Sequence, residues 1–345
     1  MGFKAQRSLT VFSLFQTHPT SPFQHVDNNM STEQSRRIWL FSHPRTTSNL
    51  FMRLMEGHPN VTQTQYLFFA SYFLGTDRQA AGDREDYKFM PAFPVWEQKN
   101  YQNSIDATQK WIKEVEEKGN IPLIMDHAMM LTPPTVPRTS MPEKPKIVDS
   151  KLDGANADRE LPVPNPTFFP DRFALTLTPI FTIRHPALVL PSYLKALSAE
   201  ASFVEKVFAE ETATSTSFKN QIQVFDFYKA LNNGAAPIVI DGERLVKNTQ
   251  EVMGKVCERL GLDETNIKYE WESKNVKMPK TLDAFTGKVL RSTGVIQDAM
   301  YDKPIDIDEQ KKKWEEEWGQ EVANRMEELV RLSMKEYEYL LQYSL

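Results

Sequence analysis

Apolar runs of strand length alternate with segments of helical spacing along this chain, and the first such unit begins at residue 37. Residues 37–41 (RIWLF) have the length and apolar character of a buried strand. Residues 50–55 (LFMRLM) then carry apolar side chains at helical spacing, and Gly57 marks the end of that helix. The pattern predicts a strand, a loop and a helix in succession.

Similar units recur further along the chain. Residues 120–128 (NIPLIMDHA) and 173–183 (FALTLTPIFTI) are predicted strands, and a helix is expected to follow the second one from about Pro186. Residues 236–240 (APIVI) form another predicted strand, followed by a helix that ends near Gly261. The chain therefore contains several strand-to-helix junctions.

The loop of the first unit, residues 42–49 (SHPRTTSN), has the chemistry of an anion site. A helix that starts after a strand directs its first amides and the positive end of its dipole at the loop, and Arg45 adds a full charge. The hydroxyls that follow Arg45 either bind phosphate oxygens or merely cap the helix. The Gly-x-x-x-x-Gly-Lys-Ser/Thr pattern is absent, which argues against an ordinary ATPase or GTPase.

A second candidate anion site lies at the end of the strand predicted over 173–183. Arg184 ends this strand, and Ser192 follows eight residues later on the next helix. Arginine offers a planar fork of donors that matches phosphate, and a serine on a helix adds a rigidly held hydroxyl. A surface ion pair is the alternative role for Arg184.

Together these two phrases resemble the cytosolic-type sulfotransferases, which use 3′-phosphoadenosine 5′-phosphosulfate as donor. Residues 44–49 (PRTTSN) match the family's Pro-Lys-Ser-Gly-Thr-Thr loop without a gap. The resemblance implies that Arg45 contacts the transferring sulfuryl group. The residues that it places around the 5′-phosphate are Thr46, Thr47, Ser48 and Asn49.

The same resemblance extends to the second phrase and to a later segment. The family binds the 3′-phosphate with an Arg and a Ser at the same spacing of eight, and the Ser is followed by Tyr. The matching residues here are Arg184, Ser192 and Tyr193. A loop that closes over the 3′-phosphate and adenosine in the family is matched most weakly, by Arg291, Ser292, Thr293 and Gly294.

His127 ends the strand predicted over 120–128, where the family has its catalytic histidine. A neutral imidazole can take the proton that an acceptor hydroxyl loses as its oxygen attacks sulfur. His43 and His185 each lie beside a predicted phosphate motif and are rival candidates for this base. The six histidines show no spacing typical of zinc sites, so we expect no metal.

The sequence also departs from the family pattern. Thr47 stands where the family has glycine, Arg45 replaces the lysine, and Met125 replaces a lysine that commonly lies two residues before the catalytic histidine. The match is therefore to divergent fungal and bacterial sulfotransferase-like proteins, over most of residues 36–300. It implies a three-layer α/β/α, P-loop NTPase-like fold with a mainly parallel central sheet.

We predict a flexible arm over residues 1–34 and one domain over 35–345. Residues 132–170, which are rich in proline and charge, are interpreted as a lid or insertion near the acceptor. Residues 306–343 are predicted to form one C-terminal helix that packs on the core or, alternatively, mediates a homodimer. The predicted acceptor pocket contains Tyr66, Phe69, Phe73, Phe168 and Phe169, the last two alternatively anchoring the loop.

Composition narrows the possible partners. The formal net charge of −5 lacks the basic excess of a nucleic-acid binder. Cys257 is the only cysteine, so no intrachain disulfide can form, and no apolar run approaches the roughly 20 residues of a membrane helix. We therefore expect a cytoplasmic protein that binds a small-molecule acceptor, with no nucleic-acid or membrane partner.

The sequence as a whole predicts an enzyme that moves a sulfuryl group to a hydroxyl or an amine of a small organic acceptor, such as a secondary metabolite. Three alternatives remain open. The fold could be repurposed for donor-independent elimination or cyclisation of a bound metabolite, it could serve a nucleotide-dependent small-molecule kinase, or it could be a nucleotide-binding scaffold without catalysis.

Overall fold

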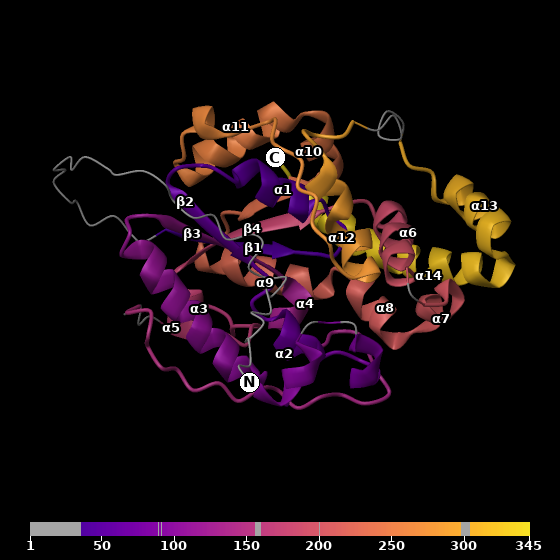
Figure 1. The fold of residues 1–345 in the computed structure, drawn as a ribbon, viewed down its shortest axis with the longest axis horizontal. Helices are drawn as coiled ribbons and strands as arrows, with labels where there is room; N and C mark the ends of the chain where they lie inside the picture. Colours follow the sequence, from indigo (N-terminus) through magenta and orange to yellow (C-terminus); the bar gives the residue numbers. More distant parts are fainter. Residues whose placement is uncertain (1–35, 89, 91, 156–159, 200, 298–303) are drawn as a thin grey trace, which may run out of the picture.

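Five parallel strands form the central sheet in the order β2-β3-β1-β4-β5 (Figure 1). The computed structural model describes residues 36–88, 90, 92–155, 160–199, 201–297 and 304–345. The predicted arm over 1–34 lies outside these residues. The strands are β1 (Arg37–Ser42), β2 (Val61–Gln65), β3 (Ile121–His127), β4 (Leu177–Ile183) and β5 (Ile238–Asp241).

Helices cover both faces of the sheet because side chains alternate along each buried strand. On β1, Ile38 and Leu40 face α1 (Ser48–Met55), α10 (Gly242–Lys247) and α11 (Thr249–Leu260). Trp39 and Phe41 face the other layer. That layer contains α3 (Tyr101–Glu116), α5 (Asp171–Ala174), α9 (Lys219–Leu231) and α14 (Gln320–Leu341). The predicted three-layer α/β/α class with a mainly parallel sheet is confirmed.

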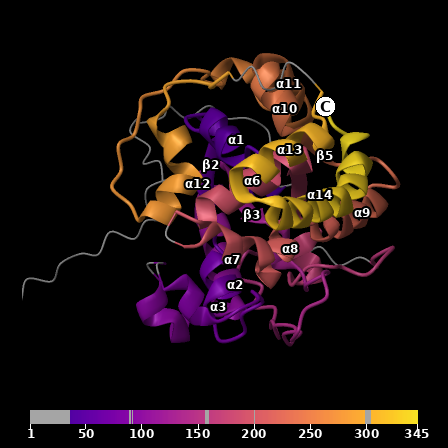
Figure 2. The same ribbon diagram turned by 90° about the vertical axis from the view of Figure 1, so that its right-hand side faces the viewer.

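A second group of helices packs beside the sheet (Figure 2). It contains α6 (Pro186–Leu197), α7 (Phe203–Phe208), α8 (Glu210–Thr216) and α13 (Ile307–Trp318), which share a buried apolar cluster with α14. Helix α12 (Lys280–Arg291) packs against α6 and α1. The remaining short elements are α2 (Phe69–Phe73), α4 (Ala128–Leu131), and the 3-10 turns η2 (Arg84–Tyr87), η3 (Phe93–Gln98) and η4 (Glu264–Asn266).

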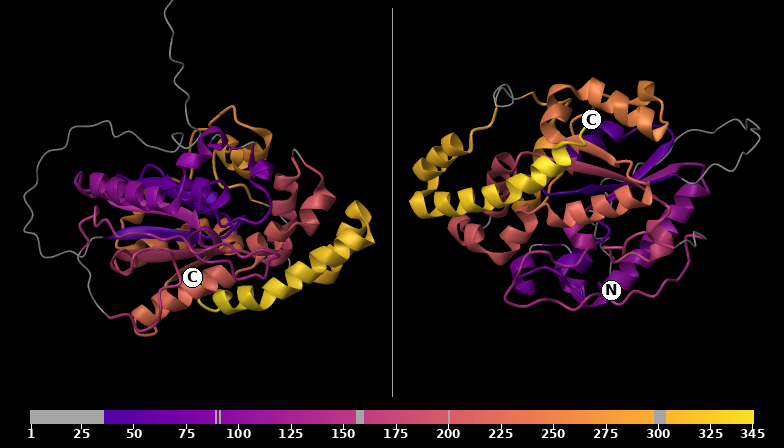
Figure 3. Two further views of the ribbon diagram at one scale, coloured as in Figure 1. Left: turned by 90° about the horizontal axis from the view of Figure 1, so that it is seen from below. Right: turned by 180° about the vertical axis from the view of Figure 1, so that it is seen from behind.

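The prediction of one C-terminal helix over 306–343 is wrong, because two helices occupy this segment. Gly319, with φ 87°, separates α13 from α14 and lets the chain turn. Figure 3 shows α14 in yellow crossing the molecule to the C-terminus. There Leu345 donates its backbone N–H to Val239 of β5 over 3.0 Å. Met326 and Val330 are buried against α6, so the apolar stripe of α14 packs on the core.

The loop over 132–170, predicted to be a lid or insertion near the acceptor, is described over residues 132–155 and 160–170, and it lies outside the lining of the cavity described below. Instead Asp153 binds Arg37, at the amino end of β1. Phe168 and Phe169 enter the core beside Trp39 and Tyr101. The later part of the loop is thus fastened to the end of the sheet where the strands begin, whereas Arg138 and Thr139 contact Glu211 and Glu210 of α8.

None of the helices within the described residues combines the length and apolarity needed to cross a lipid bilayer.

Candidate active site

The carboxyl ends of β1, β3 and β4 meet at one edge of the sheet because the three strands are parallel. Ser42 and His127 are register partners at the ends of β1 and β3. A cavity of about 1470 Å³ opens at this edge. Thirteen of the predicted site residues line it: Arg45, Thr47, Ser48, Asn49, Tyr66, Phe69, Phe73, His127, Arg184, Ser192, Tyr193, Ser292 and Gly294.

Three of the residues expected around the donor lie elsewhere. Thr46 is fully buried beneath the loop, where its hydroxyl bonds to the His43 carbonyl and the Thr182 hydroxyl. Arg291 forms an ion pair with Asp283, which lies eight residues earlier on the same helix, and Thr293 is absent from the cavity lining. The weak match over 291–294 therefore contributes only Ser292 and Gly294.

Phe168 and Phe169 are also wrong as acceptor-pocket residues. Their side chains are 4% and 3% exposed and belong to the core cluster, outside the cavity lining. Phe169 packs edge-on against Trp39 at a centroid distance of 4.8 Å, and Phe168 packs against Tyr101 at 4.9 Å. Burial of large aromatic surface explains these positions without any ligand.

The loop between β1 and α1 takes an uncommon backbone conformation. Arg45 and Thr47 have φ of 63° and 64°, in the left-handed region that costs non-glycine residues roughly 1–2 kcal/mol. Thr47 is the N-cap of α1, but its hydroxyl makes no capping hydrogen bond. It bonds instead to the Thr46 carbonyl, so capping does not explain this residue. A strained loop of this kind is typical of a functional site.

Gly242, the first residue of α10, makes room for the Thr47 side chain. A Cβ placed on Gly242 would lie 2.7 Å from Thr47 Oγ1. Thr47 stands where the family has glycine, and its side chain is accommodated because Gly242 of α10 has no Cβ.

Arg45 and Arg184 bring two guanidinium groups to the same side of the cavity. Arg45 donates from Nε to Ser192 Oγ over 2.9 Å and from Nη1 to the Phe285 carbonyl over 2.7 Å. Arg184 Nη1 in turn donates to the Arg45 carbonyl over 3.3 Å. Burial, followed by the charge of Arg184, lowers the pKa of Arg45 to about 10, so it stays a cation at neutral pH. An anion beside the two guanidinium groups would offset both the burial of the Arg45 charge and its repulsion by Arg184.

His127 faces the cavity as a neutral imidazole. Its Nδ1 lies 2.7 Å from Ser42 Oγ, and Ser42 donates to the Asp126 carbonyl over 3.3 Å. Ser42 therefore accepts from Nδ1–H, which leaves the lone pair on Nε2. Burial lowers the pKa of His127 to about 3, with smaller contributions from the charges of His43 and Arg45.

His43 and His185, the rival candidates for the base, make packing and helix-capping contacts instead. His43 is buried and stacks on Phe218 at 4.1 Å, and burial lowers its pKa to about 4. His185 Nδ1 accepts the Ala187 amide of α6 over 3.2 Å, and its pKa is also lowered to about 4 by burial. Neither lines the cavity, so His127 is the histidine among its described lining residues.

Aromatic and sulfur-containing side chains form an apolar wall next to His127. Tyr66 packs edge-on against the imidazole at 5.3 Å and against Phe69 at 5.6 Å. Tyr87, Met129 and Met130 extend this wall, as do Phe285 and other residues of α12. Sequence reasoning missed them. The position of Met129 and Met130 directly after His127 is the one signal that could have revealed part of the wall.

No group of three or more potential metal-ligating side chains occurs within the described part of the chain. Fold and site together define a parallel α/β protein with two arginines, a serine and a neutral histidine around one cavity at the carboxyl edge of its sheet. Such a cavity suits an anionic donor and a proton-accepting step next to an apolar wall.

Comparison with known proteins relates the chain as a whole to a family. No protein-family model matches the chain. It is 26% identical to "Sulfotransferase ppzF" of Metarhizium majus over 344 residues, which covers 90% of this chain and 97% of that protein. It is also 26% identical to the protein of the same name from Metarhizium rileyi, with 88% and 94% covered. The curated relatives support a divergent sulfotransferase-like family for this chain, and the expected resemblance is confirmed.

A solved structure, the sulfotransferase domain of the Synechococcus PCC 7002 olefin synthase, aligns with 88% of this chain and 98% of its own length. The sequence identity is 14% and the TM-score is 0.34.

Proposed function

We propose that this protein transfers a sulfuryl group from 3′-phosphoadenosine 5′-phosphosulfate to a hydroxyl group of a small organic acceptor. The observation that carries the proposal is the convergence of Arg45, Arg184 and His127 on one cavity. They come from the ends of β1, β4 and β3, which are far apart in sequence. The sulfotransferase names of the curated relatives support the same class of reaction.

The residues present fit an anionic nucleotide. Arg45 is a buried cation whose hydrogen-bond partners, the Ser192 hydroxyl and the Phe285 carbonyl, carry no negative charge. Arg184 and Ser192 would hold the 3′-phosphate, and Tyr193 would support that site through its hydrogen bond to Ser215. Thr47, Ser48 and Asn49, at the start of α1, would surround the 5′-phosphate. When bound, the donor supplies the activated sulfuryl group.

His127 would act as the general base at Nε2. Ser42 holds Nδ1–H and thereby keeps the basic nitrogen unprotonated and directed away from the strand. The acceptor hydroxyl would lie against the Tyr66 wall and give its proton to Nε2 as its oxygen attacks sulfur. Arg45 would stabilise the negative charge that develops on the departing phosphate. General base catalysis of this kind contributes roughly 10²–10⁴ in rate.

Calorimetric titration with 3′-phosphoadenosine 5′-phosphate tests the donor site. The Arg184→Ala variant should bind this nucleotide at least about tenfold more weakly, because a charge-assisted hydrogen bond is worth roughly 1.5–3 kcal/mol. ATP, which lacks the 3′-phosphate, should bind more weakly than 3′-phosphoadenosine 5′-phosphate to the unmodified protein.

Arg291→Ala is the matched control. Arg291 pairs with Asp283 and is absent from the cavity lining, so its removal should leave nucleotide affinity unchanged. Absence of nucleotide binding, or equal losses in the two arginine variants, would contradict the proposed donor site.

A further inference from the structure

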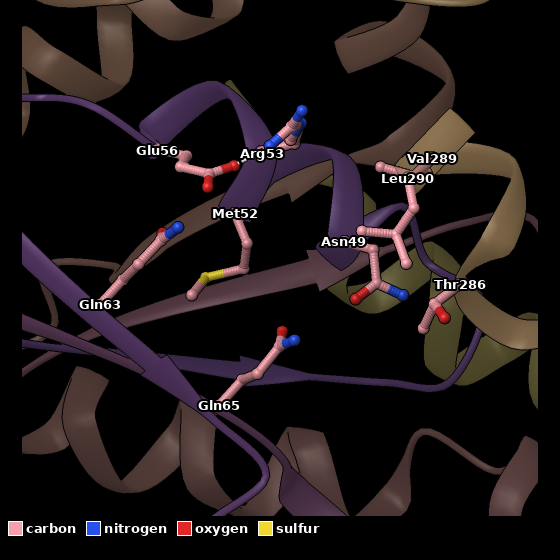
Figure 4. A pocket seen from close by; sticks show the side chains of 9 residues that line it. All are labelled: Asn49, Met52, Arg53, Glu56, Gln63, Gln65, Thr286, Val289 and Leu290. Carbon is pink, nitrogen blue, oxygen red and sulfur yellow. Dashed lines mark hydrogen bonds and ion pairs between the residues drawn. The ribbon is translucent and has the colours of Figure 1, made fainter. Parts of the chain in front are cut away.

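Two buried glutamines on β2 face a narrow crevice that adjoins the large cavity. Figure 4 shows Gln63 and Gln65 directing their amides toward α1 across this crevice. Their side chains project from the same face of the strand, since alternate residues share a face. The crevice has a volume of about 20 Å³. It is lined by Asn49, Met52, Arg53, Glu56, Gln63, Gln65, Thr286, Val289 and Leu290.

The crevice adjoins the large cavity. Asn49 and Gln65 line both spaces, as do Thr286, Val289 and Leu290 of α12. A volume of about 10–15 Å³ is enough for one water molecule, so the crevice has room for a single hydroxyl-sized group. A molecule bound in the cavity can therefore place one small polar group between the two glutamines.

The amide oxygens of both glutamines lack a hydrogen-bond partner inside the described part of the protein. Gln63 and Gln65 are 5% and 7% exposed, and the Oε1 atom of each accepts no hydrogen bond there. A buried acceptor left without a donor costs roughly 1–3 kcal/mol. Val61, two residues earlier on the same face, shows that an apolar side chain packs well in this layer. Packing alone does not account for two glutamines.

The charges around the crevice favour a neutral group over an ammonium. Glu56 forms ion pairs with both Arg53 and Lys274, so two cations share one carboxylate at this end. Arg53 also donates from Nη2 to the Glu272 carbonyl. A further positive charge in the crevice would meet net repulsion. The amide oxygens of Gln63 and Gln65 therefore favour an uncharged hydrogen-bond donor.

The crevice lies within reach of a small acceptor held at His127. Gln65 pairs with Met125 on β3, and His127 follows two residues later on the same face. Strand geometry separates the Cα atoms of Gln65 and His127 by about 8 Å. One aromatic ring with a short substituent spans such a distance.

We propose that Gln63 and Gln65 form a specificity subsite for a neutral hydrogen-bond donor, a second hydroxyl carried by the acceptor. This inference rests on the proposed function, because it assumes that the reacting hydroxyl lies at His127. It names the acceptor class as a small molecule with two hydroxyl groups, one that reacts and one that is only recognised.

Three phenols test the subsite by calorimetry, with and without saturating 3′-phosphoadenosine 5′-phosphate. They are 4-(2-hydroxyethyl)phenol, its side-chain methyl ether, and 4-ethylphenol. Only the first presents a second O–H donor. It should bind about tenfold more tightly than the other two, which corresponds to about one hydrogen bond. Gln65→Met and Gln63→Met should each reduce this preference to less than about twofold.

Gln109→Met is the matched control. Gln109 is a buried glutamine of α3, on the opposite layer, and its Nε2 also lacks a partner among the described residues. This variant should keep the tenfold preference. Thermal unfolding of all three variants checks that they fold, and the two β2 variants should be no less stable than the parent because they lose unsatisfied amides.

Equal affinity for the three phenols, no binding of any of them, or a preference that survives both β2 substitutions would each overturn the subsite. Equal affinity would mean that the crevice holds only water. The measurement needs no turnover, so it separates this inference from the proposed function. Failure of nucleotide binding would count against sulfuryl transfer, whereas loss of the phenol preference alone would count only against the subsite.

Discussion

Arginines are buried at both ends of the central sheet: at the amino edge, where the strands begin, and at the carboxyl edge, where they end. The two edges differ in the groups that bind the arginine side chains. At the amino edge, Arg37 forms ion pairs with Glu116 and Asp153, and Arg172 pairs with Asp149 and Asp153. At the carboxyl edge, Arg45 donates to a hydroxyl and a carbonyl, and both of these partners are neutral.

The pKa values of the arginines follow this difference. Burial lowers the pKa of Arg172, but the hydrogen bonds and charges of Asp149 and Asp153 outweigh it and raise the pKa. Burial also lowers the pKa of Arg45, and the charge of Arg184 lowers it further, to about 10. The amino edge is electrostatically complete within the protein. At the carboxyl edge the hydrogen-bond partners of Arg45 are neutral, and the anion proposed above would supply the negative charge.

Removing the imidazole at the carboxyl edge should produce the largest effect on turnover. His127→Ala is expected to reduce sulfuryl transfer by about 10²–10⁴-fold, because no other histidine lines the described cavity and Nε2 is the proposed base. Initial rates with radiolabelled donor measure the change. Affinity for 3′-phosphoadenosine 5′-phosphate should stay within about twofold, since Arg184 and Ser192 would hold the nucleotide. An unchanged rate would reject His127 as the base.

Breaking the amino edge should instead affect stability. Arg37→Met roughly keeps the length of the buried side chain but removes one cation from Glu116 and Asp153, and Asp153 still pairs with Arg172. Removing one partner of a fully buried ion pair costs about 3–5 kcal/mol, but Asp153 keeps Arg172 and Glu116 is partly exposed, so urea unfolding should show a smaller loss of about 1–3 kcal/mol. Nucleotide affinity of the folded protein should not change. The comparison between the edges fails if Arg37→Met weakens nucleotide binding without destabilising the fold.

Lys255→Met provides the control for this second variant. Lys255 pairs with Glu251 on the exposed surface of α11, and exposed pairs contribute about 0–1 kcal/mol. Its unfolding free energy should therefore differ little from that of the parent protein.

Sequence patterns predicted the carboxyl edge better than the amino edge because the residues of the former lie in short local phrases. Arg45 follows β1 directly, and Arg184 and Ser192 stand one strand-to-helix junction apart. Parallel strands then bring these phrases to one edge without any further information. The position of His127 at the end of β3 follows from the same rule.

The amino edge carries no such signal, because Arg37 meets Glu116 and Asp153 across 79 and 116 residues of sequence. Phe168 and Phe169 were misplaced for a similar reason: a loop's aromatic residues reveal neither which layer they enter nor which residues they contact. The apolar wall from α12 was missed because Phe285 reaches the cavity only through the packing of that helix against α6. These features depend on long-range packing.

The strain in the loop gives a smaller and more local test of the carboxyl edge. Thr47→Gly removes a side chain from a backbone with φ 64° and should stabilise the protein by up to about 1 kcal/mol. Gly242→Ala should destabilise the parent, because its Cβ would lie 2.7 Å from Thr47 Oγ1. The same substitution should cost about 1 kcal/mol less in the Thr47→Gly background. Additive unfolding free energies would show that the two positions are not coupled.

The smallest expected effect is that the His127 imidazole does not titrate near neutral pH. The pKa of His127 is lowered to about 3, so its imidazole in the ligand-free protein should stay neutral from pH 8 to pH 5. NMR of protein labelled with ¹⁵N-histidine, assigned with His127→Gln, should show a constant shift and the proton on Nδ1. An exposed histidine would titrate near pH 6.5 over this range.

The sign of the linked stability change follows from the same shift. Below about pH 6.5 the unfolded chain takes up a proton at His127 while the folded protein does not, so this residue destabilises the fold as the pH falls. The loss continues until the folded-state pKa is reached, at about 3. His127→Gln should therefore make the free energy of unfolding depend less on pH between those two values.

Ser42→Ala removes the group that accepts Nδ1–H of His127. This variant should move the imidazole proton toward Nε2 in the NMR spectrum. A proton that remains on Nδ1 would show that Ser42 does not set the tautomer.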